Sequence, residues 1–306
     1  MRQLGWDGVV FEVPDNWELA RYHYAFSGVV RLVIEDEYAV RMEAEWLEAR
    51  KEGQAQRFTE HTTQSLAALI KKADSQVVLD GLPSAWRAVH CHFSEIIPVR
   101  RRDRTLGVVA HDLVTAIYAP RDTFRCVIRL HFMPGDKEPP VELARRVLTS
   151  FAWNATPGEK KLWQVFDLSY RIDASFQLES TTFGIGSKLL VFRRDGRRLY
   201  LWTLSCADRL PVNEPGGSEW VIGYLNGLRR VTGIVFRPDG AGGIGWKRRG
   251  LLALVHRDEL ARWCFRYTVD YRVLEERNQL MIRVFNYRHE ADLDWLAPAS
   301  FGPAAE

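Results

Sequence analysis

The sequence predicts an α+β fold that consists of two tandem copies of one domain, each an antiparallel β-sheet with helices packed on one face. The main observation is an internal repeat between residues 11–19 and residues 170–178. The two segments align without a gap and place large apolar residues opposite each other: Phe11 with Tyr170, Val13 with Ile172, Trp17 with Phe176, and Leu19 with Leu178. Apolar residues at every second position are typical of a half-buried strand. A tryptophan precedes each segment, Trp6 in the first and Trp163 in the second.

The length of the chain is the second observation. A chain of 306 residues has room for two domains. A repeat of about 150 residues indicates a duplicated domain, because each copy is long enough to bury its own core. The polar, breaker-rich segment over residues 154–161 lies between the copies. We therefore expect a first domain over residues 1–153, a linker over 154–162 and a second, diverged domain over 163–306.

In the first copy, alternating apolar residues predict strands, and an apolar stripe at helical spacing predicts a helix between them. Pro120-Arg-Asp is typical of a hairpin turn between the last two strands, and Pro139-Pro140 is typical of the first turn of a closing helix that ends near Phe151. The predicted elements in order are strands at 9–13, 29–34 and 39–46, a helix at 58–73, strands at 86–93, 107–118 and 123–133, and the closing helix.

The second copy repeats this order with changes. Ser218 can cap a helix that runs through Val231, with Trp220 and Leu225 on its buried side. The closing helix has little counterpart, because Glu290–Leu296 is short and Pro298 stops it. The predicted strands lie at 163–172, 189–192, 199–204, 251–256, 263–273 and 279–287.

The order of these elements carries a resemblance to a known group of folds. With Phe11-x-Val13-Pro14-x-x-Trp17 near its start and Ser150-Phe151 at the end of its last helix, the first copy resembles the Mog1/PsbP-like superfamily. The resemblance extends more faintly to the second copy. It implies a binding or assembly role, because members of that group are mostly non-catalytic. No functional residue of the photosystem II extrinsic protein or of the Ran-binding Mog1 maps onto this chain.

Composition restricts the class of protein. Hydrophobic residues make up 46% and aromatic residues 12%, which is enough for packed cores. No apolar stretch is long enough to cross a bilayer, so we expect no membrane association. The first residues lack the pattern of an export signal, which also departs from the photosynthetic branch of the superfamily, and we expect a cytoplasmic protein. The four cysteines never form C-x-x-C, and we expect neither a zinc site nor a disulfide framework.

The sharpest candidate site is His90-Cys91-His92. On a strand these histidines point to one face, opposite to Cys91. On a later strand Phe124, Cys126, Ile128, Leu130 and Phe132 take the inner face. We therefore expect one outward basic surface, the candidate binding face, made of His90, His92, Arg125, Arg129 and His131. It could bind an anionic ligand or a partner, or it could be paired with acids of the chain itself; His111 or His131 could add a third metal ligand.

Several other functions are disfavoured by the sequence. The net charge of +3 and the lack of aromatic residues among the outward positions argue against nucleic acid. Of the 42 basic residues 34 are arginine, which suits ion pairs or anion binding but also follows from base composition. Gly240-Ala-Gly242-Gly-Ile-Gly245 matches a dinucleotide fingerprint but lacks the helix that must follow it, so we read a hairpin loop.

No signature of a catalytic nucleophile is present, and no cofactor is expected. We therefore predict a non-enzymatic, cytoplasmic binding or assembly protein with a protein partner. The alternative is a small-ligand or metal-binding protein, whether an enzyme or not, that uses the His/Arg face.

Overall fold

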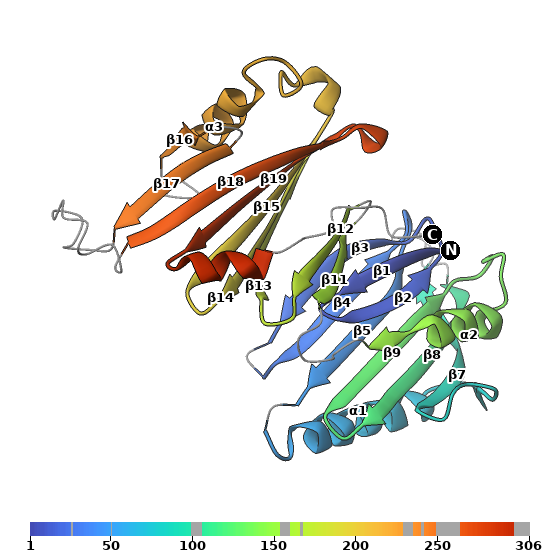
Figure 1. Ribbon diagram of the computed structural model, residues 1–306. Helices are drawn as coiled ribbons and strands as arrows, with labels where there is room; N and C mark the ends of the chain where they lie inside the picture. The colour runs from blue at the N-terminus through green and yellow to red at the C-terminus, as the bar shows by residue number, and fades with distance from the viewer. Residues whose placement is uncertain are drawn as a thin grey trace. The chain divides into compact units, whose positions relative to one another are not determined.

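The computed structural model describes residues 1–25, 27–49, 51–98, 106–153, 160–165, 168–228, 235–239, 242–248 and 264–296. Contacts divide these residues into two units (Figure 1). The first unit holds residues 1–153 and 161–170, and the second holds residue 160 and residues 171–296. Residues 161–170 fall in the first unit and not after the expected linker, because Trp163 packs edge-on against Trp6 with ring centroids 5.2 Å apart.

The first unit is built on an antiparallel seven-stranded sheet. A smaller sheet has the order β1 (Arg2–Trp6), β2 (Val9–Val13) and β10 (Ala152–Trp153), and two helices, α1 (Gln54–Ile70) and α2 (Pro140–Ser150), complete the unit. The order of the large sheet is β3 (Glu18–Tyr24), β4 (Val29–Glu35), β5 (Val40–Glu48), β9 (Phe124–Phe132), β8 (Leu106–Arg121), β7 (Trp86–Pro98) and β6 (Ser75–Val78).

The second unit has another antiparallel seven-stranded sheet and the helix α3 (Gly217–Gly227). Its short helical turns are η1 (Ala207–Arg209), η4 (Glu275–Arg277) and η5 (Glu290–Leu296). The strands β11 (Lys160–Val165) and β12 (Leu168–Asp173) pair with each other, and most of their residues fall in the first unit. The sheet order is β13 (Gln177–Gly184), β14 (Ser187–Arg194), β15 (Arg197–Ser205), β19 (Gln279–Tyr287), β18 (Cys264–Leu274), β17 (Gly242–Arg248) and β16 (Phe236–Asp239).

The two large sheets have the same strand order. Each runs through its first three strands in sequence and then through its last four in reverse, with a helix between the third and the fourth strand of the sequence. The fold is therefore α+β with antiparallel sheets, as the sequence predicts. The strand predicted at 251–256 lies outside the described residues, as do the end of the helix predicted through Val231 and most of the linker.

The agreement between the sheets extends to local backbone detail. The register between β3 and β4 shifts between Leu19 and Arg21, and the register between β13 and β14 shifts between Leu178 and Ser180. Immediately before each bulged strand, a turn is closed by the amide of a buried aromatic residue, from Trp17 to the carbonyl of Pro14 and from Phe176 to that of Asp173, at 3.0 Å in both cases. The repeat that the sequence shows thus coincides with a repeated turn and bulge.

Each face of the first sheet is covered by a different layer. On one face, which we call the α1 face, Leu69 and Ile70 at the end of α1 pack against a buried cluster of Cys91, Phe93 and Leu113. On the other, the α2 face, the ring of Phe151 directly after α2 contacts those of Trp86 and Tyr118 at 5.3 and 5.0 Å. The prediction that the helices pack on one face is wrong for this unit, because β7 and β8 carry buried apolar residues on both faces and need a layer on each.

In the second unit, α3 lies on one face of the sheet over a hydrophobic cluster (Figure 1). Val221 and Leu225 of α3 belong to the same buried cluster as Trp202, Ile282 and Val284 of the sheet. Among the described helices of both units, none is long and apolar enough to cross a membrane.

Candidate functional site

The two histidines of β7 meet a carboxylate on the neighbouring strand. His92 is paired with Asp112 in the register of β7 and β8, and His90 lies two residues along the same face. His90 Nε2 and His92 Nδ1 lie 2.8 and 3.0 Å from the same oxygen, Oδ1 of Asp112. Partial burial raises the pKa of Asp112, but the hydrogen bonds from His92 and His90 outweigh it and lower that pKa below its usual value. The carboxylate is thus held ionised between two imidazoles.

The basic residues of β9 are engaged elsewhere. Arg125 donates from Nε to Oγ1 of Thr59 on α1 at 3.1 Å. Arg129 lies 3.6 Å from the carboxylate of Glu45 on the adjacent strand β5. His131 Nε2 lies 3.7 Å from Glu43 of β5, which is an ion-pair distance and too long for a hydrogen bond.

Arg31 of β4 joins this group from the other side of β5. It lies 2.6 Å from Glu43 and 3.4 Å from Glu45. His131 and then Arg31 lower the pKa of Glu43 to about 2, against a partial burial that raises it. The two glutamates contact Arg31, Arg129 and His131 within one network across three strands.

The prediction that the histidines of β7 share a face with Arg125, Arg129 and His131 is wrong. His92 pairs with Asp112, and Asp112 pairs with Phe132, so both histidines lie on the α2 face with the buried residues of β9. Leu113 pairs with His131 and with Cys91, so the β9 cations lie on the α1 face. The inference assumed that Cys91 and Cys126 lie on one buried face, whereas each belongs to a different buried layer.

The structure also bears on the metal and nucleotide alternatives. In the part of the chain that is described, no group of three or more His, Cys, Asp or Glu residues is arranged to hold a metal ion. Both β7 histidines direct a ring nitrogen at the Asp112 oxygen itself. In the glycine motif, Gly242 to Gly245 belong to the antiparallel strand β17, with Gly245 opposite Phe236 of β16. A dinucleotide motif would have a helix N-terminus there.

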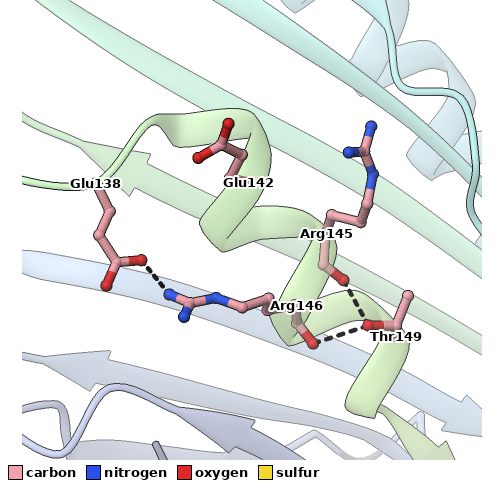
Figure 2. Close-up of a pocket in the computed structure, with 5 residues that line it drawn as sticks. All are labelled: Glu138, Glu142, Arg145, Arg146 and Thr149. Atoms are coloured by element: carbon pink, nitrogen blue, oxygen red, sulfur yellow. Dashed lines mark hydrogen bonds and ion pairs between the residues drawn. The ribbon is translucent and has the colours of Figure 1, made fainter.

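An open groove of about 570 Å³ runs along α2 (Figure 2). Glu138, Glu142, Arg145, Arg146 and Thr149 line it, all from one stripe of the helix and the short segment before it. Arg146 is ion-paired with Glu138, and Thr149 donates to the carbonyl oxygens of Arg145 and Arg146 at 2.8 and 3.1 Å. None of the sequence-predicted site residues lines this groove. Its opposite charges cancel, so it offers no concentrated charge to a ligand.

The feature that sequence reasoning missed is the edge strand β6. It ends the first sheet, and all four of its residues are exposed. Val77 and Val78 are 61% and 65% exposed although they point to opposite faces. A signal was available, because the β-branched pair lies four residues after the end of the predicted helix, but a run of four residues is too short to show periodicity.

Comparison with protein-family models gives no match, and comparison with curated proteins gives none either. Among solved structures, the chain is similar to the one described as "Crystal structure of MucB in complex with MucA(peri)", with 11% sequence identity and a TM-score of 0.19. The match covers 95% of this chain and 92% of that chain. A likeness with so low a TM-score supports no inference about fold or function.

Proposed function

We propose that this protein is a non-enzymatic binding or assembly protein that recognises a protein partner. The observation that carries the proposal is the contrast between its charged residues and its β6 edge. The cations and histidines of the predicted face are each used in contacts within the first unit. The uncharged edge strand β6 leaves its side chains and one side of its backbone exposed. Exposed, uncharged sheet edges are sites at which other chains add.

We infer that the two units are tandem copies of one ancestral domain. The shared strand order, the shared bulge and the shared aromatic turn support this inference. Membership of the Mog1/PsbP-like superfamily and a cytoplasmic location stay part of the proposal. The copies have diverged beneath their equivalent helices, since α3 covers an apolar cluster and α1 lies on the face that carries the Glu43 and Glu45 network. Divergence of this kind allows one copy to recognise a partner while the other supports it.

The proposal is tested by capture on the immobilised full chain from native lysate, at low and at high salt, followed by identification of the bound proteins. We expect a specific protein to be retained by the wild type and lost from a Val77→Lys/Val78→Lys variant. Tyr38→Lys is the matched control, because Tyr38 is also strongly exposed but lies in the turn between β4 and β5. Retention of no protein at low salt would contradict the proposal.

The alternative, a metal or small-ligand site at His90 and His92, makes a different prediction. It requires stoichiometric metal in the purified protein and its loss in His90→Ala. The binding proposal predicts no stoichiometric metal in either protein. Elemental analysis of both distinguishes the two.

A further inference from the structure

We propose that β6 binds an extended segment of the partner by strand addition, and that this segment carries basic residues at both ends of a short apolar run. The inference rests on the proposed function and names its site and the chemistry of the partner. It follows from the backbone of β6, from its side chains and from the charges at its two ends.

The backbone of β6 has one free side. The amide of Leu79 donates to the carbonyl of Ala88 at 3.0 Å, so this pair of β6 and β7 residues is hydrogen-bonded. Hydrogen-bonded pairs alternate along an antiparallel ladder. Ser75 and Val77, which pair with His92 and His90, therefore direct their backbone groups at β7. The N–H and C=O groups of Gln76 and Val78 point away from the sheet, where an added strand would hydrogen-bond to them.

The side chains of β6 lack the devices that protect sheet edges. Charged residues, proline and bulges commonly block strand addition. The equivalent strand of the second unit, β16, contains Arg237 and Pro238. The opposite edge of the first sheet, β3, is bulged and carries Arg21 in an ion pair with Glu35. By contrast β6 reads Ser-Gln-Val-Val and pairs with β7 without a register shift.

The charges beside β6 select the occupant. Asp74 and Asp80 flank the strand, both are exposed, and neither carboxylate has an ion-pair partner among the residues that the structure describes. If β6 paired with β6 of a second copy in the register that joins Gln76 to Val78, Asp74 would lie opposite Asp80 at both ends. Like charges in directly opposed cross-strand positions are destabilising. A segment with Lys or Arg at its ends would instead form two favourable pairs.

The test measures the fluorescence anisotropy of two labelled peptides, Lys-Val-Thr-Val-Thr-Val-Lys and Glu-Val-Thr-Val-Thr-Val-Glu, titrated with the full-length protein. We expect saturable binding of the lysine-flanked peptide. The affinity for the glutamate-flanked peptide should be weaker by a factor of about ten or more. Val78→Pro removes an outward N–H and leaves the ladder with β7 intact, and it should weaken binding about tenfold. Val78→Thr is the matched control, because it retains the N–H.

A second variant, Asp74→Lys/Asp80→Lys, changes two exposed side chains and should reverse the preference between the peptides. Absence of saturable binding of the lysine-flanked peptide to the wild type, or equal affinity in Val78→Pro, would overturn the inference. Retention of a captured protein by both Val78→Pro and Val77→Lys/Val78→Lys would leave the proposed function standing and remove β6 as its site. Capture of no protein by the wild type is the separate failure of the proposed function.

Discussion

Arg197 donates from Nε and Nη2 to the two carboxylate oxygens of Asp292, at 3.0 and 3.2 Å. The first unit contains the same clamp, in which Arg41 donates to Asp136 at 2.8 Å, and in both units the two residues are 95 positions apart. Each aspartate also accepts a backbone N–H at 2.8 Å, from Met133 in the first unit and from Arg288 in the second. Each clamp ties the start of the third strand of its sheet to the segment that follows the last strand.

Removing the second clamp should destabilise the protein strongly. Asp292→Ala leaves a partly buried guanidinium without its carboxylate and two backbone amides without an acceptor, so we expect a loss of about 3 kcal/mol in the free energy of unfolding. Asp136 is more exposed than Asp292, and Asp136→Ala should cost about 1 kcal/mol. Urea denaturation of the two variants measures both. Equal losses would show that burial does not set the strength of the clamp.

Glu43 should make the stability of the first unit depend on acidity. Its pKa is about 2 in the folded chain against an ordinary value of 4.5, so its contribution is fully present above about pH 4.5 and is lost as the pH falls toward 2. Glu43→Gln should therefore be less stable than the wild type at neutral pH, and the difference should shrink below pH 4.5. Thermal unfolding of the wild type and Glu43→Gln across this pH range measures how the stability difference changes with pH. A difference that grows as the pH falls would contradict the assignment.

Two glycines of α3 should respond in opposite directions to the same change. A Cβ at Gly217 would lie 2.2 Å from the backbone oxygen of Val212, whereas a Cβ at Gly223 meets nothing within 4 Å. Gly223→Ala should stabilise the protein by about 0.5–1 kcal/mol through helix propensity. Gly217→Ala should destabilise it by about 1–3 kcal/mol through overpacking. The denaturant midpoints of the two variants, compared with that of the wild type, measure both effects. Stabilisation by Gly217→Ala would contradict the close packing at Val212.

The placement of β11 in the first unit rests on a close contact. A Cβ at Gly5 would lie 2.7 Å from Cγ and Cδ2 of Leu162, which is buried. Gly5→Ala should destabilise by about 1–3 kcal/mol, and Leu162→Ala in the same chain should relieve the clash. A double-mutant cycle on the free energy of unfolding measures this coupling. Additive effects would mean that the two residues are not in contact.

Most of the inner strands were predictable from the sequence because their buried apolar residues alternate with polar ones. The pairs Trp17 with Phe176 and Leu19 with Leu178 identified the repeat, and the structure places a turn and a bulge at these residues in both units. The edge strands β3, β6 and β13 are absent from the predicted elements, and β6 has only four residues. Pattern reasoning needs a longer run to separate a strand from a loop.

The candidate site was less predictable because the faces of two strands had to be related through a third. His90 and His131 both alternate with apolar residues, and alternation alone cannot say which of two buried layers each strand faces. The pairing of Asp112 and Leu113 on β8 with both neighbouring strands shows which layer each strand faces. The ion pairs of Glu43 and Glu45 were hidden for the same reason, since their partners lie on neighbouring strands.

Site-resolved hydrogen exchange of the backbone amides of β6, in the full-length protein with and without the lysine-flanked peptide, tests the central claim most directly. In the free protein we expect the amides of Gln76 and Val78 to exchange fast and that of Val77 to be protected by its bond to β7. Addition of the peptide should protect Gln76 and Val78. Protection of these two amides in the free protein, or no change at saturating peptide, would contradict the account.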